Sequence, residues 1–276
     1  MSLRLMAALG LAASFAWSSP SRADPTAQAA LRVSPQRETV LTSWVPEKPR
    51  GVVLLSTGHG SWPEKYDAIA SAWKAAGFAV IAPLHVDSIR YPERDKFTAQ
   101  ASFGERIADL KAASGYAAAT WPALPVIAAG HSFGTLSALC LGGGLSYVGN
   151  FRDPKVKAVI GFSSPGRVPG LVQPQAYASD DLPILLITGD RDVVPGIVTN
   201  WQDHLLPIQT SPAGDKFAIT YAGAGHDLIG APADPNFAPA VAATIRFLQA
   251  YALDDEPAKA WLRAGDDTTA GSWIRR

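Results

Sequence analysis

Three residue types in this sequence occur in the order needed for nucleophilic catalysis. A serine, Ser132, stands in the string GHSFG, and a histidine, His226, follows much later in the string AGAGHD. Two aspartates, Asp190 and Asp192, lie between them in TGDRDVVPG. A serine hydroxyl needs a base to take its proton, and the base needs an acid to orient it. The order serine, aspartate, histidine therefore predicts a triad with Ser132 as nucleophile and His226 as base.

The two aspartates compete for the third position of this triad. Asp190 follows Gly189 at the end of a predicted strand, where its carboxylate can instead cap the turn by accepting backbone N–H groups. Asp192 lies further into the loop, just before residues 193–195, which are expected to hold it over the edge of the sheet. We predict Asp192 as the acid and keep Asp190 as the alternative.

Attack on a carbonyl group also needs donors for the oxygen that becomes negative. The backbone N–H of Phe133, the residue after the nucleophile, is expected to supply one donor. The glycine-rich string STGHGSW lets the main chain approach a substrate, so the N–H of His59 is predicted as the second donor. Trp62, Tyr66 and the loop 164–168 are expected to form walls of the substrate cleft.

The other histidines have simpler interpretations. His131 occupies the variable position of the serine string and is expected to be a packed neighbour. His204 falls on a predicted surface helix and is expected to face solvent. His85 and Asp87 stand two residues apart without further ligands, which is too few for a metal site. We therefore expect no metal site.

These residues need a framework that brings them together. Six short apolar runs are predicted as strands: residues 52–56, 78–82, 126–129, 156–162, 184–188 and 217–221. They are apolar throughout, as expected for parallel strands covered on both faces. Helical patterns alternate with them over residues 66–76, over 102–120 and from about residue 234. The alternation predicts an α/β fold with a mainly parallel central sheet and helices on both faces.

The serine string lies at a strand-to-helix junction of this pattern. It follows the strand 126–129 and opens an apolar helix, which is the setting of a nucleophile elbow. Gly130 and Gly134 fit such a turn, because strand and helix then pack without side chains between them. Residues 37–45 alternate in polarity and predict an antiparallel edge hairpin. The stretch 164–181 is short and rich in proline and glycine, so no large cap domain is expected.

The composition favours one globular domain with a small-molecule substrate. The chain has 276 residues, of which 47% are hydrophobic and 17% are charged, so it can bury a large core. Its 24 basic residues balance 24 acidic ones without forming a basic run. This balance argues against nucleic acid as a partner. We expect a single domain over residues 24–276.

The first residues have the pattern of an export signal. Arg4 precedes an apolar run over residues 5–17, and Ser21 and Ala23 place small side chains at a cleavage site. The run is too short to span a bilayer. We therefore predict a signal peptide over residues 1–23, no stable membrane insertion, and a periplasmic or secreted location for the chain that begins at Asp24.

Several strings together resemble the α/β-hydrolase superfamily, and within it the bacterial dienelactone-hydrolase-like and platelet-activating-factor-acetylhydrolase-like serine esterases. They are LLSTGHGS, GFAVIAPLHVDS, AAGHSFGTLSALCLGG, KAVIGFSSPG, LPILLITGDRDVVP and AGAGHD, and the similarity covers residues 39–262. The resemblance implies hydrolysis of a carboxylic ester through an acyl-serine, without a cofactor. It places the nucleophile at Ser132, the acid at Asp192 and the base at His226.

The sequence departs from these relatives at three points, one of which is Thr135 after Gly134, where a further glycine is frequent and which is expected only to tighten the packing of the helix. True dienelactone hydrolases carry cysteine where Ser132 stands, and many relatives have His-Gly where this chain has Thr57 and Gly58. A thioesterase, a lipase or polyester hydrolase, a peptidase and an acyltransferase with the same triad remain alternatives. A binding protein on an inactive hydrolase scaffold and a structural envelope protein are alternatives of other classes. The intact triad argues against the first of these, and the absence of sequence repeats argues against the second.

Overall fold

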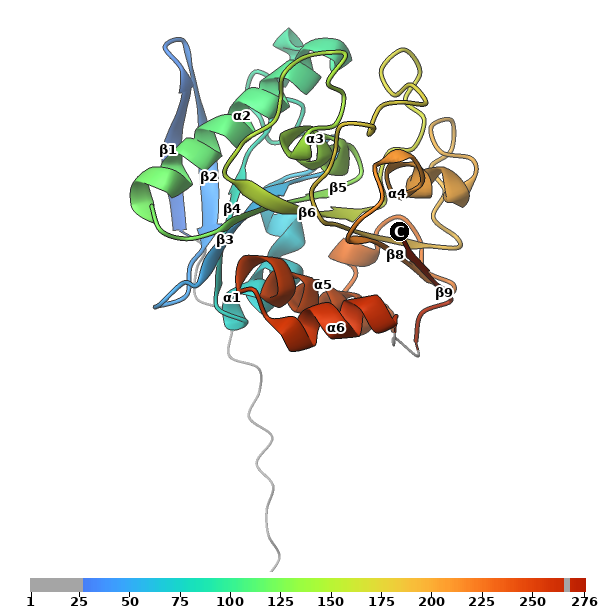
Figure 1. The fold of residues 1–276 in the computed structure, drawn as a ribbon. Coiled ribbons are helices and arrows are strands. Elements are labelled where there is room, and N and C mark those ends of the chain that lie inside the picture. The colour runs from blue at the N-terminus through green and yellow to red at the C-terminus, as the bar shows by residue number, and fades with distance from the viewer. Residues whose placement is uncertain (1–26, 266–268) are drawn as a thin grey trace, which may run out of the picture.

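One nine-stranded sheet organises the residues that the computed structural model describes, which are 27–265 and 269–276. In this part of the chain the strand order is β1-β2-β4-β3-β5-β6-β7-β8-β9 (Figure 1). The strands are β1 (Ala27–Ser34), β2 (Arg37–Trp44), β3 (Gly51–Ser56), β4 (Phe78–Pro83), β5 (Val126–His131), β6 (Val156–Phe162), β7 (Ile184–Gly189), β8 (Lys216–Tyr221) and β9 (Ser272–Arg275). The α-helices are α1 (Asp67–Ala75), α2 (Ala99–Thr120), α3 (Phe133–Gly142), α4 (Leu206–Thr210), α5 (Phe237–Ala252) and α6 (Glu256–Ala264).

The six central strands, β3 to β8, run parallel to one another, as their apolar runs predict. The predicted edge hairpin is also present, because β1 and β2 pair antiparallel and β2 pairs antiparallel with β4. The opposite edge carries β9, which pairs antiparallel with β8 and was not predicted. Its four residues are partly or fully exposed and contain no apolar run, so the sequence pattern offers no signal for it.

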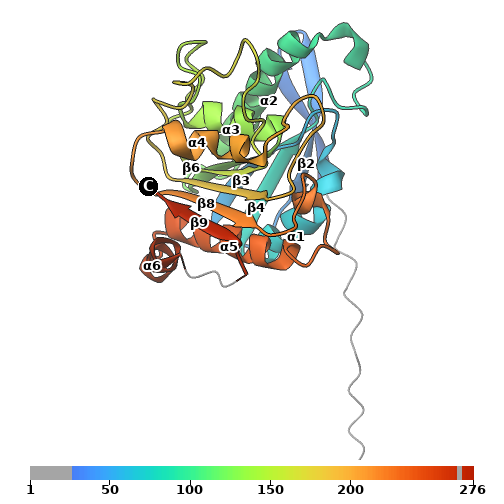
Figure 2. The same ribbon diagram turned by 90° about the vertical axis from the view of Figure 1, so that its right-hand side faces the viewer.

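Helices cover both faces of the sheet. α2, α3 and α4 lie on one face, and α1, α5 and α6 lie on the other (Figures 1 and 2). The side chains of each strand alternate between two apolar cores: in β3, Val53 and Leu55 belong to the core with α1 and α5, whereas Val52 and Leu54 belong to the core with α2 and α3. A strand buried on both faces has no polar side, which explains the continuous apolar runs. The predicted α/β architecture is confirmed.

The connection between β6 and β7 contains turns and bends and neither helix nor strand. It forms no cap domain, as predicted from its length and composition. Among the helices of the described ranges, none is long and apolar enough to cross a membrane. The predicted signal peptide, residues 1–23, lies outside the described residues.

Asp180 is a fully buried carboxyl group next to the end of α3. A Cβ added at Gly142, the last residue of α3, would lie 2.9 Å from Oδ1 of Asp180. Burial raises the pKa of Asp180 to about 7, against the opposing charges of Lys216 and Arg152. The folded protein therefore keeps a proton at Asp180 that the unfolded chain releases at lower pH.

We predict that the stability of the Asp180→Asn variant, relative to that of the natural protein, is higher at alkaline pH than at acidic pH. Because the folded pKa lies above the unfolded value, the contribution of Asp180 to stability is fully present below about pH 4 and is lost as the pH rises to about 7. The melting temperature of the variant minus that of the natural protein should rise between these two pH values and then stay level. The exposed Asp181→Asn is the control and should show no such rise. A difference for Asp180→Asn that does not depend on pH would contradict the prediction.

Candidate active site

Ser132 occupies a strained turn between β5 and α3. Its backbone has φ 54° and ψ −121°, a conformation that residues other than glycine avoid. The N–H of Ser132 donates to the carbonyl of Phe162 at 2.9 Å, and the carbonyl of Ser132 accepts the N–H of Thr135 at 2.9 Å. These bonds hold Ser132 at the carboxyl end of β5, where it lines a pocket. The predicted strand-turn-helix geometry is therefore present.

The two glycines of the serine string are required by close backbone contacts. A Cβ added at Gly130 would lie 2.2 Å from the carbonyl oxygen of Gly134, and a Cβ added at Gly134 would lie 2.1 Å from the carbonyl oxygen of Ser56. Such contacts are too short for any side chain, so only glycine fits at either position. Thr135 Oγ1 also lies within hydrogen-bond distance of the carbonyls of Gly130 and Phe162, at 2.8 and 2.7 Å, and stabilises the same turn.

Asp192, and not Asp190, reaches the histidine. Oδ1 of Asp192 accepts a hydrogen bond from Nδ1 of His226 at 2.7 Å, and Oδ2 accepts one from the hydroxyl of Thr188 at 2.8 Å. Asp190 instead accepts the backbone N–H of Gly223 at 2.7 Å. The structure thus brings together the predicted pair and gives Asp190 the alternative role of capping a turn.

The Asp192 carboxylate determines which nitrogen of His226 carries the proton. Burial raises the pKa of Asp192, but hydrogen bonds from His204 and His226 outweigh burial and hold the pKa well below its usual range. An ionised carboxylate only accepts, so Nδ1 of His226 is the donor of this hydrogen bond. The side chain of His226 is 22% exposed, so solvent or a ligand can reach it.

A chain of buried hydrogen bonds connects the loop after β3 to the loop that carries His226. The N–H of Gly58 donates to the hydroxyl oxygen of Tyr66 at 2.9 Å, and this hydroxyl donates to Nδ1 of His131 at 2.9 Å. Nε2–H of His131 then donates to the carbonyl of His226 at 2.8 Å. Burial, with the nearby His226, lowers the pKa of His131 to about 4, so its ring is neutral at neutral pH. Because His131 adjoins Ser132, this series of hydrogen bonds connects the loop after β3, the turn at Ser132 and the loop that carries His226.

The structure does not place Trp62 and Tyr66 at the predicted walls of the cleft. Tyr66 is only 1% exposed, because the short 3-10 helix η1 (Pro63–Tyr66) directs its hydroxyl toward His131. Trp62 lies under the guanidinium of Arg90, which is 4.2 Å from the ring centroid. Neither aromatic residue lines the pocket beside Ser132.

Arg106 of α2 supports the loop after β3, a role that its sequence context did not reveal. Its side chain is fully buried and donates to the carbonyls of Thr57 at 2.6 Å and Gly58 at 3.0 Å. It also forms two hydrogen bonds with the carboxylate of Asp87, at 2.9 and 2.7 Å. An isolated buried charge is strongly unfavourable, so Arg106 and Asp87 depend on each other.

Asp87 in turn holds the second half of the loop. It accepts the N–H of Gly60 at 3.2 Å and lies 2.8 Å from Nδ1 of His59. Within the described ranges, the backbone N–H groups of His59 and Phe133 have no hydrogen-bond partner, and both residues line the pocket with Ser132. The two N–H groups predicted as oxyanion donors are therefore available to a ligand oxygen.

A second serine-histidine-aspartate arrangement lies beneath this loop. Nε2 of His85 is 2.9 Å from Oγ of Ser56, and Nδ1 of His85 is 2.9 Å from Oδ2 of Asp109. Arg37 pairs with the other oxygen of Asp109 at 2.5 Å. Ser56, His85 and Asp109 are each 0% exposed, so no substrate reaches this serine. The arrangement is structural and supports β3 next to the elbow.

His204 is buried, in contrast to the prediction that it faces solvent. It lies in the 3-10 helix η3 (Trp201–Leu205), and its ring contacts Ser164 after β6 and Asp192 after β7. Asp192, His204 and His226 have metal-ligating atoms within 4.8 Å of one another. These side chains already contact one another: Oδ1 of Asp192 lies 2.7 Å from Nδ1 of His226 and 2.9 Å from Nε2 of His204. A metal ion bound by these three residues would have to replace the two protons that lie between Asp192 and the histidines.

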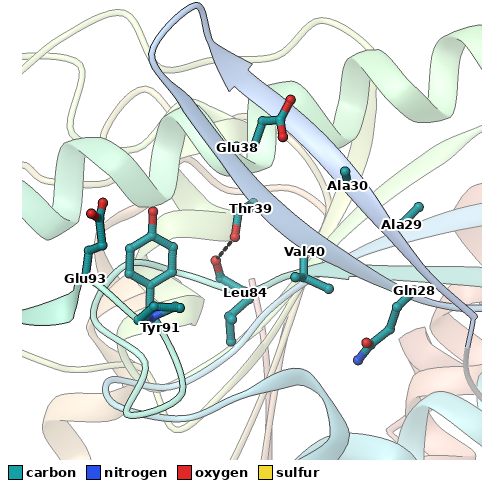
Figure 3. A pocket seen from close by; sticks show the side chains of 10 residues that line it. Gln28, Ala29, Ala30, Glu38, Thr39, Val40, Leu84, Tyr91 and Glu93 are labelled. Carbon is teal, nitrogen blue, oxygen red and sulfur yellow. Dashed lines mark hydrogen bonds between the residues drawn. The ribbon is translucent and has the colours of Figure 1, made fainter.

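The pocket beside Ser132 has a largely apolar lining and a volume of about 570 Å³. Its residues are His59, Gln100, Phe103, Ser132, Phe133, Pro165, Val168, Pro169, Gly170, Leu171 and Ile197. The loop 164–168 contributes to it, as predicted. Another pocket of the same volume lies beside the β1–β2 hairpin (Figure 3), and none of the candidate catalytic residues lines it.

Two sequence comparisons each match less than half of the chain. Residues 47–174 match the family described as serine aminopeptidase, S33. The monoacylglycerol lipase of Mycolicibacterium smegmatis is 31% identical over 123 residues, which are 44% of this chain and 40% of the lipase. The match therefore spans less than half the length of this relative.

Solved structures resemble nearly the whole described fold. An alpha-beta serine hydrolase homologue from Coxiella burnetii has a TM-score of 0.61 at 17% identity, with 83% of this chain and 100% of that chain covered. A dienelactone hydrolase from Anabaena variabilis has a TM-score of 0.62 at 20% identity, with 84% and 100% covered. The chain therefore has the α/β-hydrolase fold, as the sequence predicts.

We predict that Tyr66→Phe destabilises the protein by about 1–3 kcal/mol, because it leaves the buried N–H of Gly58 without an acceptor and removes the donor to His131. Denaturant unfolding of the variant and the natural protein measures the difference. Tyr177→Phe is the matched control, because the Tyr177 hydroxyl is buried and has no hydrogen-bond partner among the described residues. Equal losses in the two variants would refute the role assigned to Tyr66.

Proposed function

We propose that this protein is a serine hydrolase that cleaves carboxylic esters through an acyl-serine intermediate. The observation that carries the proposal is the hydrogen-bonded Asp192–His226 pair, which is tied through His131 to a strained serine that lines a pocket. The α/β-hydrolase fold and the likeness to a monoacylglycerol lipase support it.

The reaction follows from the protonation state of His226. Nε2 of His226 takes the proton of Ser132 as the serine oxygen attacks the ester carbonyl, and Asp192 stabilises the imidazolium that forms. The N–H groups of His59 and Phe133 donate to the oxyanion. Collapse of the tetrahedral intermediate breaks the bond to the alcohol, which leaves with the proton from His226. Water then attacks the acyl-serine with His226 again as base and releases the carboxylic acid.

The pocket lining favours an apolar acyl group. Phe103, Leu171 and Ile197 present hydrocarbon surface beside Ser132, and burial of an apolar chain there is favourable. Thioesters, amides, lipid esters and polyesters are alternative substrates for the same triad, and an acyltransferase would pass the acyl group to an alcohol instead of water. A panel of p-nitrophenyl esters from acetate to palmitate, with a thioester, an amide and a polyester beside it, ranks these substrates directly.

The proposed triad makes a specific prediction for two variants. Ser132→Ala and Asp192→Asn should each lower kcat for the best ester by about four orders of magnitude, the first by removing the nucleophile and the second by misorienting the imidazole. A fluorophosphonate should label the natural protein at Ser132, as read by mass spectrometry of the labelled peptide.

Asp190→Asn is the matched control for Asp192→Asn, because it makes the same chemical change two residues away in the same loop. It should keep kcat within a few-fold and lower stability by about 1 kcal/mol, through the weakened bond to the N–H of Gly223. Labelling at another serine, or loss of turnover in Asp190→Asn and not in Asp192→Asn, would overturn the assignment.

We further propose that the protein is exported. The support is the pattern of residues 1–23, in which a charged start, a short apolar run and small residues precede Asp24. Mass spectrometry of the protein from the periplasm or the medium of an expressing bacterium should find an amino terminus at or near Asp24. Recovery of an intact Met1 from that fraction would contradict cleavage.

A further inference from the structure

Asp192 is shared by two histidines. Besides His226, His204 places Nε2 2.9 Å from Oδ1 of Asp192 and 3.0 Å from its backbone carbonyl. Nδ1 of His204 hydrogen-bonds to the carbonyl of Ser164, and the Ser164 hydroxyl donates to the carbonyl of His204 at 2.8 Å. This reciprocal pair of contacts fixes the orientation of the ring, which is 0% exposed.

Every polar atom that faces the His204 ring is an acceptor. The partners are two carbonyl oxygens and one carboxylate oxygen, none of which carries a hydrogen. A neutral imidazole has one N–H, so one of its nitrogens would direct a lone pair at an acceptor in a site without water access. Only the doubly protonated ring satisfies both sides, and the carboxylate of Asp192 balances its charge.

We propose that His204 is a permanently protonated imidazolium that acts as a positioning residue of the triad, by holding Asp192 and neutralising part of its charge. The role assigned to it in catalysis rests on the proposed function, because it acts through the base His226. Burial lowers the pKa of His204, but hydrogen bonds and the charge of Asp192 outweigh burial and raise the pKa above its ordinary value.

Apart from Asp192, the described residues around His204 add no compensating charge at the ring. Strand β7 and helix α4, which pack against η3, contain no titratable residue. His226 faces it from the loop after β8, with the ring centroids 5.9 Å apart. On η3 itself, Asp203 pairs with Arg167 at 3.2 Å. Asp192 is therefore the counter-charge of His204.

The positive charge of His204 affects the imidazolium that forms on His226 during the reaction. A lone carboxylate would stabilise that cation strongly, whereas a carboxylate already paired with a cation stabilises it less. His226 then returns its proton more readily to the leaving alcohol. The same pairing keeps Asp192 ionised and fixes Oδ1, which both histidines use.

Nuclear magnetic resonance of the natural protein with nitrogen-15 in its histidines tests the charge directly. At about pH 8, above the ordinary histidine pKa of 6.5, His204 should show protons on both ring nitrogens. The two ring N–H signals are assigned to His204 because they should be absent from the spectrum of the His204→Gln variant. A single ring proton on His204 at this pH overturns the proposal, and this arm needs neither turnover nor a variant that retains activity.

The pH dependence of kcat/KM tests whether the charge acts on the base. His204→Gln keeps an N–H donor for Asp192 but removes the positive charge, so the acidic limb of the profile should move to higher pH by about one unit. Thr188→Val removes a neutral hydrogen bond from the same carboxylate and is the control, with a clearly smaller movement expected. A purely structural role would lower kcat or the melting temperature and leave the limb in place.

The outcomes separate this proposal from the proposed function. Two ring protons on His204 together with a moved acidic limb support it, and two ring protons with an unmoved limb overturn the positioning role. If Ser132→Ala retained full turnover, the ester-hydrolase proposal would fail, while the two-proton signature of His204 would still stand or fall by itself.

Discussion

The close approach of three backbone segments at the elbow is the constraint on which the site depends. The backbones of Gly130 and Gly134 approach each other so closely, and that of Gly134 approaches Ser56 so closely, that neither glycine could carry a Cβ atom. This contact places α3 directly above the ends of β3 and β5 and forces Ser132 into a conformation that costs about 1–3 kcal/mol. From Gly134 to Gly142 every residue of α3 is buried, so its packing maintains the strain. A helix free to shift would relax the turn and move the hydroxyl.

Two groups of buried charges fix the loops on either side of this turn. On one side, Arg106 and Asp87 hold the loop that carries His59. On the other side, Asp192 lies between His204 and His226. Buried charges are stable only with partners in good geometry, so each group permits one arrangement of its loop and resists others. The neutral His131 then connects the two sides through hydrogen bonds, without adding a charge next to Ser132.

The comparisons and the site carry different parts of the functional argument. Solved structures with 17–20% identity share the fold, and a shared fold of this kind accommodates many chemistries. The proposal of ester hydrolysis therefore rests on the site itself: the strained Ser132, the Asp192–His226 hydrogen bond, and the backbone N–H groups of His59 and Phe133, for which the described residues offer no partner. A largely apolar pocket lining lies beside them.

The sequence by itself determined the parallel sheet, the turn at Ser132 and the order of the residues proposed as a triad, because each depends on local pattern: apolar runs, adjacent glycines, and polar residues just after strands. It also narrowed the candidate acid to Asp190 or Asp192, and the structure places Asp192 against His226 and Asp190 against the backbone of Gly223. Only the tertiary structure decided the roles of Tyr66, Arg106 and His204. The partners of these three residues lie far away in the chain. Tyr66 and His204 each stand in a short polar helix, where the sequence pattern suggests exposure to solvent, but the folded chain buries both side chains. Which side chain is buried, and beside which charge, is determined by the packing of distant segments, which no local pattern encodes.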